Sequence, residues 1–156
     1  MLKRFLISLI ISAGVLISGL GLAQDAPSTV LNYEMAEKAM AAALSEARAN
    51  EWNLTIVIAD HNGLPVMLHR MDGASPRSYD IALAKVKVVT ETGLLSGEYG
   101  RRLSAGEIDE VEGGVTYAGG VPVMLNGERI GAITSSGARG SEDEQVSKAG
   151  AAAIGD

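Results

Sequence analysis

Residues 54–71 read Leu-Thr-Ile-Val-Ile-Ala-Asp-His-Asn-Gly-Leu-Pro-Val-Met-Leu-His-Arg-Met, and this stretch decides the fold. It contains two apolar segments, 54–59 and 64–71, with the length and the β-branched content that are typical of strands. Between them lies the pair Asn62-Gly63, and both residues accept the positive φ that a tight hairpin turn requires. The stretch therefore predicts two antiparallel strands joined by a short turn.

A second hairpin is expected downstream, because another Asn-Gly pair at 126–127 separates the apolar segments 121–125 and 128–135. A further short strand is expected at 115–117, before a glycine turn. With the helices described next, the order is α-β-β-α-α-β-β-β-α. Hairpins without crossover helices predict an α+β domain, in which helices pack against a central antiparallel sheet of about five strands.

The predicted helices begin at recognisable capping residues. Asn32 is a favourable N-cap for the first helix, and Ser75-Pro76 provides a cap and a first-position proline for the second. Ser141 and Glu144 have the spacing of a capping box at the start of the last helix. Helices are expected at 31–50, at 76–92, within 96–112 and from 141 onward.

The N-terminus has the three parts of a secretory signal. Residues 1–4 carry two positive charges, residues 5–22 form an almost purely apolar run, and small residues precede Gln24. We expect a signal peptide at 1–23, a flexible leader at 24–30 and a single domain at 31–156, with the exported protein periplasmic or extracellular. The alternative is an uncleaved membrane anchor, since the apolar run approaches the length of about 20 residues that spans a bilayer.

Composition excludes several classes of function. The 156 residues include no cysteine, which rules out disulfides, thiol catalysis and thiolate metal sites. The chain has 13 basic and 19 acidic residues, and loss of residues 1–23, with Lys3 and Arg4, would leave 11 basic residues and a formal charge of −8. No segment clusters basic and aromatic residues, so neither nucleic acid nor, after signal cleavage, a membrane is an expected partner. Without disulfides, the domain is expected to gain stability as a homo-oligomer.

The residues contain no recognisable catalytic or metal-binding constellation. There is no Gly-x-Ser-x-Gly nucleophile motif, and His61 and His69 are the only two imidazoles. No His-x-His, His-Glu-x-x-His or calcium-loop pattern is present, so no catalytic residue and no metal site are predicted. We therefore expect a binding protein rather than an enzyme.

One glycine-rich turn, within residues 131–140, has the chemistry to bind an anion. It runs from a strand into a helix start, where backbone amides and the helix dipole converge. The candidate contacts are Ser135, Ser136, Gly137 and Arg139. A tight turn without a ligand explains the same residues, because the Walker lysine and the Gly-x-Gly-x-x-Gly pattern are both missing.

One strand has the composition of a haem-binding surface, because His69 alternates with Met67 and Met71 on one of its faces. Haem needs an apolar slot and an axial nitrogen or sulfur donor, which this arrangement would supply. On the residues alone, the simpler interpretation is that His69 is a hydrogen-bonded strand residue and His61 a solvated turn residue.

Six motifs follow one another in a recognisable order along the chain. They are Ile58-Ala-Asp60 with Gly63, Arg70-Met-Asp-Gly-Ala74, residues 78–85, Ala118-Gly-Gly-Val-Pro122, Gly127 with residues 130–138, and Asp143-Glu-Gln followed by Ala149–Ala153. Together they resemble the GlcG/HbpS-type family of small haem-binding proteins, from about residue 31 to the C-terminus. A related domain occurs on PduO-type corrinoid adenosyltransferases.

The resemblance implies a compact domain with a central antiparallel sheet, assembly into dimers or larger oligomers, and haem as the ligand of the exported branch. The expected function is therefore haem handling, storage or sensing by an exported, non-enzymatic protein. Two alternatives stay open: an exported binder of a small organic anion at the 134–140 turn, and an oligomeric interaction protein with a vestigial pocket. The candidate axial donors are His69 first, because a strand fixes its direction, and then His61, Tyr117, Met67 and Met71.

Overall fold

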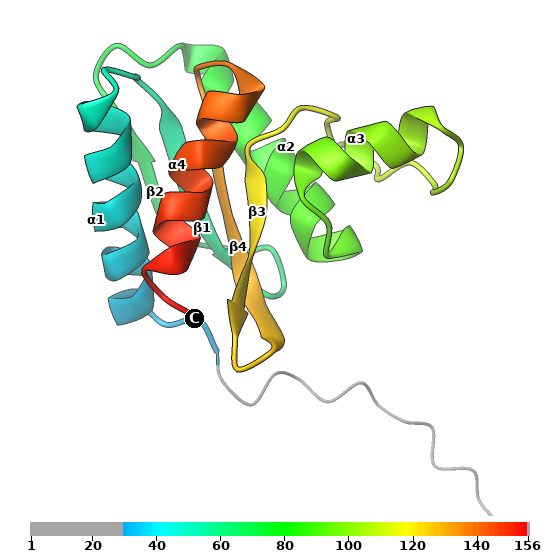
Figure 1. Ribbon diagram of the computed structural model, residues 1–156, viewed down its shortest axis with the longest axis horizontal. Coiled ribbons are helices and arrows are strands. Elements are labelled where there is room, and N and C mark those ends of the chain that lie inside the picture. The colour runs from blue at the N-terminus through cyan, green and yellow to red at the C-terminus, as the bar shows by residue number, and fades with distance from the viewer. Residues whose placement is uncertain (1–29, 156) are drawn as a thin grey trace, which may run out of the picture.

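Residues 30–155 fold into helices packed on both faces of one antiparallel sheet (Figure 1). The computed structural model describes these residues, and the predicted signal peptide at 1–23 and most of the leader at 24–30 lie outside them. The elements, in chain order, are α1 (Tyr33–Ala49), β1 (Thr55–Asp60), β2 (Pro65–Arg70), α2 (Pro76–Thr92), α3 (Ser96–Ser104), β3 (Gly120–Leu125), β4 (Glu128–Ser136) and α4 (Gly140–Ala152).

The sheet has the strand order β2-β1-β4-β3, and every neighbouring pair is antiparallel. α1 and α4 cover one face of the sheet, and α2 covers the other (Figure 1). β2 and β3 are the edges, and Pro65, which has no amide hydrogen, begins the edge strand β2. The predicted α+β class is confirmed, with four strands in the described residues where about five were expected.

The strand expected at 115–117 does not form, because α3 holds this segment. The Ser96 hydroxyl donates a hydrogen bond to the Tyr117 carbonyl over 2.7 Å. The Thr116 carbonyl lies so close to Gly100 that a Cβ atom there would be 2.4 Å from the oxygen. Backbone polar groups of this segment therefore contact a helix instead of a neighbouring strand.

Both predicted hairpins are confirmed. In the first turn Gly63 has a φ of 80°, and the Asp60 carboxylate accepts a hydrogen bond from the Leu64 amide over 3.0 Å. In the second turn Asn126 and Gly127 have φ values of 52° and 81°. The second pair adopts positive φ at both residues, as predicted, whereas in the first pair only Gly63 does and Asn62 does not.

The helix ends agree with the sequence at α1 and differ at α4. The Asn32 side chain accepts a hydrogen bond from the Met35 amide over 3.0 Å, as expected for an N-cap. The capping box predicted for Ser141 and Glu144 is wrong. The N-cap of α4 is Arg139, two residues before Ser141, so Glu142 is the residue that reaches back and accepts from the Arg139 amide over 2.9 Å.

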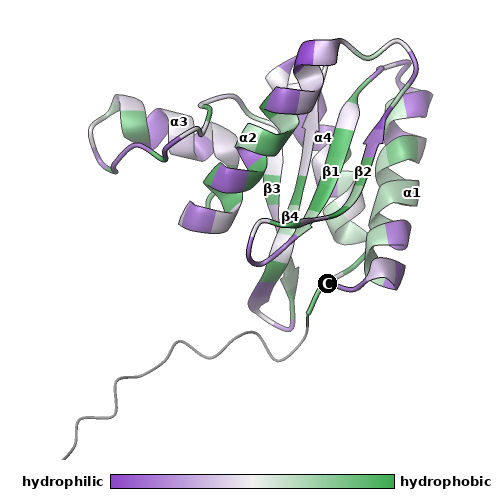
Figure 2. Ribbon diagram, turned by 180° about the vertical axis from the view of Figure 1, so that it is seen from behind, coloured by the Kyte–Doolittle hydropathy of each residue, from purple (hydrophilic) through white to green (hydrophobic). Residues whose placement is uncertain are grey.

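The core has one layer on each side of the sheet. Alternation along β1 directs Ile56 and Ile58 to the layer under α1 and α4, and directs Val57 and Ala59 to the layer under α2. All four side chains are fully buried, and each of the two isoleucines and Val57 contributes up to about 1.5–3 kcal/mol of hydrophobic stabilisation. In Figure 2, accordingly, β1 is coloured apolar along most of its length.

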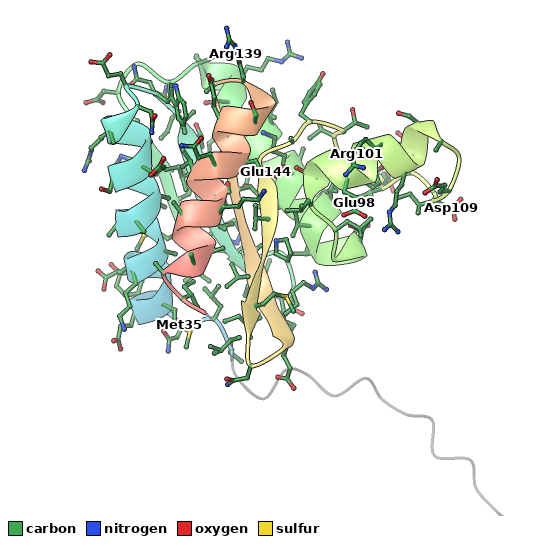
Figure 3. The ribbon with its side chains drawn as sticks, viewed as in Figure 1. Met35, Glu98, Arg101, Asp109, Arg139 and Glu144 are labelled. Carbon is green, nitrogen blue, oxygen red and sulfur yellow. The ribbon has the colours of Figure 1, made fainter. Side chains whose placement is uncertain are left out.

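α3 and the segment after it project sideways from the sheet, and the charged side chains of Glu98, Arg101 and Asp109 lie on this arm (Figure 3). Tyr99 anchors the arm, since it is buried and its hydroxyl accepts a hydrogen bond from the Val111 amide over 2.9 Å. The arm matters for function because the loop that follows it lines a cavity.

Candidate functional site

Three hollows adjoin one another through shared lining residues, and the loop 137–139, which joins β4 to α4, lines two of them. We call them the His69 hollow, the loop hollow and the Lys85 cavity, with volumes of about 360, 470 and 420 Å³. Asn53 lines the first two, and Ala138 lines the last two. Arg139 marks this end of the molecule in Figure 3, and Met35 marks the opposite end.

The His69 hollow combines one imidazole with two guanidinium groups. β2 pairs only with β1, so its outer edge is open and the His69 side chain is exposed. The Arg70 guanidinium donates a hydrogen bond to the Ala74 carbonyl over 2.7 Å, which holds it beside the turn after β2. The hollow is lined by Arg48, Asn53, His69, Arg70, Met71 and Asp72, and two of these carry positive charge against one negative.

The five candidate donors do not converge on one place. Met67 and Met71 are half-buried against the core layer under α1, and Met71 also lines the His69 hollow. In the hairpin register His69 pairs with Ile56 near the start of β1, whereas His61 follows the end of β1. The two imidazoles therefore lie at opposite ends of the hairpin, and Tyr117 lies at the Lys85 cavity.

His61 has a buried ring nitrogen. Its Nδ1 atom has no hydrogen-bond partner among the described residues, although the ring as a whole is only half-buried. The residue lies in the β1–β2 turn, away from the three hollows.

The amides proposed as an anion site are bonded to carboxylates of the same chain. The Ala138 amide donates to the Asp143 carboxylate over 3.0 Å, and the Arg139 amide donates to the Glu142 carboxylate over 2.9 Å. Negative charge is thus already present where the helix dipole favours it. Gly137, with a φ of 143°, lies against the Asn53 carbonyl, where a Cβ atom would be 2.6 Å from the oxygen.

The other two anion candidates are buried in the strand. Ser135 and Ser136 both lie in β4, and the Ser135 hydroxyl shares a hydrogen bond of 2.9 Å with the Ser147 hydroxyl of α4. Arg139, in contrast, extends into solvent, and 87% of its side chain is exposed. Of the four anion candidates, only Gly137 and Arg139 line the loop hollow.

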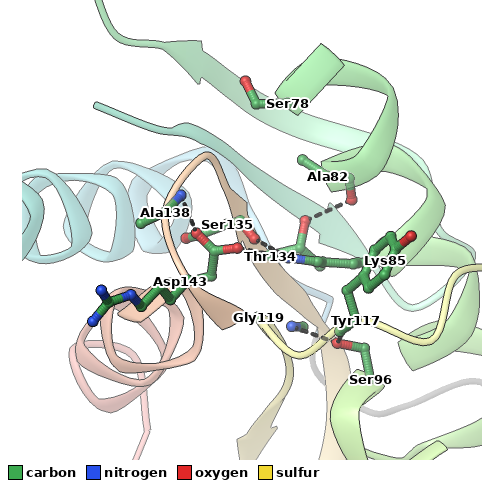
Figure 4. A network of polar contacts seen from close by, with 12 residues as sticks. Ser78, Ala82, Lys85, Ser96, Tyr117, Gly119, Thr134, Ser135, Ala138 and Asp143 are labelled. Atoms are coloured by element: carbon green, nitrogen blue, oxygen red, sulfur yellow. Dashed lines mark hydrogen bonds and ion pairs between the residues drawn. The ribbon is translucent and has the colours of Figure 1, made fainter. Parts of the chain in front are cut away.

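The Lys85 cavity contains a buried ion pair (Figure 4). Lys85 Nζ donates to the Ser135 carbonyl over 2.7 Å and lies 3.0 Å from the Asp143 carboxylate, and its side chain is 1% exposed. Burial lowers the pKa of the Lys85 ammonium and raises the pKa of the Asp143 carboxyl, and their mutual attraction opposes both shifts. The pair links α2, β4 and α4.

Sequence reasoning missed this pair, although each residue gave a signal. Lys85 lies on the apolar stripe of α2, one turn from Ala82 and Val89, where a charge needs a buried partner. Asp143 lies in the first turn of α4, where complementing the helix dipole is enough to explain an acidic residue. No local pattern connects residues that are 58 positions apart.

Tyr117 stands at the mouth of the Lys85 cavity instead of in a strand. About half of its side chain surface is accessible, and its neighbours Thr116 and Ala118 also line the cavity. The phenol therefore faces a space that holds one amine and one carboxyl group.

Residues 30–155 contain no candidate for a membrane-spanning helix or for a cluster of metal ligands. No helix within them is long and apolar enough to cross a membrane. Within the same residues, no group of three or more His, Asp or Glu side chains could hold a metal ion.

Residues 31–152 match the model of a protein family described as "Haem degrading protein HbpS-like". The chain belongs to the HbpS-like family. The match covers almost all of the described residues, so the whole α+β domain is the family domain. The GlcG/HbpS-type resemblance seen in the sequence motifs is thereby confirmed.

Similar proteins extend this assignment. GlcG of Escherichia coli K12 is 34% identical over 114 residues, and the match covers 67% of this chain and 79% of GlcG. A crystal structure of a Streptomyces reticuli HbpS double mutant is 33% identical, with a TM-score of 0.76 over 93% of this chain and 100% of that one. A structure of a PduOC:heme complex, at 21% identity, shares the fold, with a TM-score of 0.69 over 81% of this chain and 96% of that one.

Proposed function

We propose that this HbpS-like chain is an exported haem-binding protein and that haem binds at the His69 hollow. The observation that carries the proposal is the hollow itself, where an exposed imidazole lies beside two guanidinium groups. The description of the family and the heme complex of a protein with the same fold support haem as the ligand. In this proposal the chain holds or delivers haem and does not turn it over.

The residues of the hollow fit the chemistry of haem. His69 is an accessible nitrogen donor of the type that takes an axial position on haem iron. The guanidinium groups of Arg48 and Arg70 match the two carboxylates of haem, because arginine binds carboxylates through paired hydrogen bonds. When bound, haem would supply a redox-active iron that the chain itself lacks.

The loop hollow extends the surface available to a flat ligand. It adjoins the His69 hollow at Asn53, and it is lined by the half-buried indole of Trp52. A macrocycle anchored at His69 could lie across Asn53 with one edge toward this ring, which would remove apolar area from water. Arg139 at the far side of the loop hollow adds a third cation.

A haemin titration of the purified chain tests the site, with binding measured by the Soret absorbance. We expect His69→Ala to shift the Soret band and to weaken affinity at least about tenfold, since even outer-shell changes at metal sites cost about that much. His61→Ala and Tyr117→Phe are matched controls, because His61 lies outside the hollows and Tyr117 lies at the Lys85 cavity. If His69→Ala keeps the wild-type spectrum and affinity, the assignment is wrong.

The same sample tests whether haem is turned over. The complex is incubated with ascorbate in air, and the Soret band is followed over time. A stable band is expected for a protein that holds or delivers haem. Progressive bleaching that occurs only when the protein is present would contradict this expectation and would show that the chain degrades haem.

Export is the second part of the proposal and rests on the sequence pattern of residues 1–24. Mass spectrometry of the secreted or periplasmic protein is expected to give Gln24 as its first residue. Recovery of the full-length chain in the membrane fraction would support an uncleaved anchor instead.

A further inference from the structure

The Lys85 cavity holds an amine that neither the ion pair nor the proposed haem site explains. The cavity is separate from the His69 hollow, and no residue lines both. Its volume of about 420 Å³ is in the range of small-molecule pockets. Lys85 and Asp143 both line it with 1% and 5% of their side chains exposed, so the buried pair forms part of the wall of this space.

Charge balance in the cavity favours a neutral ligand. The Lys85 ammonium and the Asp143 carboxylate compensate each other at 3.0 Å, and they are the only ionisable groups besides the Tyr117 phenol among the lining residues. An anion would add an uncompensated buried charge, which is unfavourable. A neutral molecule with an electrophilic carbonyl group would add none.

Transfer of one proton from Lys85 to Asp143 converts the charged pair into a neutral amine and a carboxylic acid. Burial favours the uncharged forms of both groups, because it lowers the pKa of Lys85 and raises that of Asp143. Passing the proton from Nζ to the carboxylate over 3.0 Å gives a free amine beside a carboxylic acid. An N–H of this amine can stay bonded to the Ser135 carbonyl while rotation about Cε–Nζ turns the lone pair toward the cavity.

We propose that Lys85 forms a reversible imine with a small aldehyde or ketone bound in the Lys85 cavity. The amine nitrogen attacks the carbonyl carbon, and a proton passes from this nitrogen to the carbonyl oxygen to give a neutral carbinolamine, so that Asp143 keeps its own proton. Asp143 then donates its proton to the carbinolamine hydroxyl, the C–O bond breaks and water leaves. The product is a protonated imine paired with the Asp143 carboxylate, and the reaction converts one ammonium and one carbonyl into one iminium and one water.

The walls of the cavity restrict the size of the carbonyl compound. Gly119 packs against the amine so closely that a Cβ atom there would be 2.5 Å from Nζ. Ile81 and Ala118 supply apolar wall, and Tyr117 stands at the mouth. The cavity volume would admit a fused aromatic aldehyde, but only 1% of the Lys85 side chain is exposed, so access to Nζ sets the limit. A short aliphatic aldehyde is expected to reach the amine, whereas a bulky aromatic one is not.

Reductive trapping tests the proposal on the full purified chain. The protein is incubated with acetaldehyde and cyanoborohydride, which reduces an imine to a stable secondary amine, and the modified lysines are mapped by peptide mass spectrometry. We expect Lys85 to react at least about tenfold faster than Lys87, which lies two residues along the same helix and is exposed. With naphthaldehyde the order is expected to reverse.

Substitution of the acid supplies the matched comparison. Asp143→Asn keeps an acceptor for the Ala138 amide but removes the proton carrier, and we expect it to slow labelling of Lys85 at least about tenfold. Glu91→Gln, at an exposed position near the end of α2, is the control and is expected to leave the rate unchanged. If wild-type Lys85 is labelled no faster than Lys87, the proposal is wrong, whatever the variants do. Haemin binding is measured separately, so failure here leaves the proposed function standing.

Discussion

The buried pair of Lys85 and Asp143 can be tested by substituting one partner and measuring the free energy of unfolding. Lys85→Met removes the ammonium and leaves a buried carboxylate with no charge partner, because the pair is 1% and 5% exposed. We expect this variant to lower the free energy of unfolding by about 3–5 kcal/mol in urea. The double variant Lys85→Met/Asp143→Leu is expected to recover most of the loss, since it leaves neither charge buried. A single variant as stable as wild type would contradict the pairing.

The same two residues give stability a pH dependence with a definite sign. Burial raises the pKa of Asp143 above 3.8, so just above pH 3.8 the native state keeps a proton that the unfolded state has lost, and stability falls as pH rises. Burial lowers the pKa of Lys85 below 10.5, so just below pH 10.5 the unfolded state keeps the extra proton, and stability rises with pH.

Urea unfolding of wild type and of Lys85→Met/Asp143→Leu across this pH range isolates the contribution of the pair. The stability of wild type relative to the double variant is expected to be lowest near neutral pH and to increase toward both ends. A maximum near neutral pH would mean that attraction within the pair, and not burial, sets the two pKa values.

The sequence could predict the position of some residues of the site but not which residues surround them. His69 was placed correctly on a strand, because alternation with Met67 and Met71 is a local pattern. Its neighbours Arg48 and Asn53 come from the end of α1 and the loop that follows. Only the folded chain brings them together, so no spacing in the sequence could have indicated them.

At the scale of elements, the sequence predicted best where the backbone itself imposes the structure. Both Asn-Gly turns formed at residues that tolerate positive φ, which Gly63, Asn126 and Gly127 adopt and Asn62 does not. The Asn32 cap formed because it satisfies a free amide. The segment 115–117 failed as a strand because contacts with α3, which are not local, hold its backbone. Tertiary contacts overrode propensity there.

The contact between α1 and α4 depends on a small residue. A Cβ atom at Gly150 would lie 2.3 Å from Ile133 Cδ1 and 3.0 Å from the Ala39 carbonyl. Gly150→Ala is therefore expected to destabilise the fold by about 1–3 kcal/mol through overpacking, although alanine favours helices. Thermal unfolding measures this, with the exposed Ala152→Ser as a control expected to stay within about 0.5 kcal/mol. A stabilised Gly150→Ala variant would show that the two helices can separate without cost.

At the scale of the whole molecule, segments that are distant in the sequence form the three hollows. The hollows adjoin one another at Asn53 and at Ala138. From the sequence came one haem hypothesis and one anion hypothesis, and each concerned a separate motif. In the structure the His69 hollow and the loop hollow adjoin at Asn53. One ligand could therefore contact residues from both motifs. The sequence indicated the motifs and the family, and the structure supplies their adjacency.

Assembly is the second property of the whole molecule that can be measured. A chain with no cysteine and with two edge strands, β2 and β3, has open backbone positions that a second copy can cover. Light scattering of the purified protein is expected to give a dimer or a larger oligomer, with a melting temperature that rises with concentration. A dilute monomer with full thermal stability would contradict this expectation.

Haem binding at the His69 hollow is the central claim, and paramagnetic broadening tests it most directly. Ferric haem broadens the NMR signals of nearby nuclei, so haemin is added stepwise to isotope-labelled protein and the amide signals are followed. Signals of Asn53 and of residues 69–73 are expected to broaden first. Broadening centred on the Asp60–Gly63 turn or on Tyr117, or the absence of any localised change, would contradict the account.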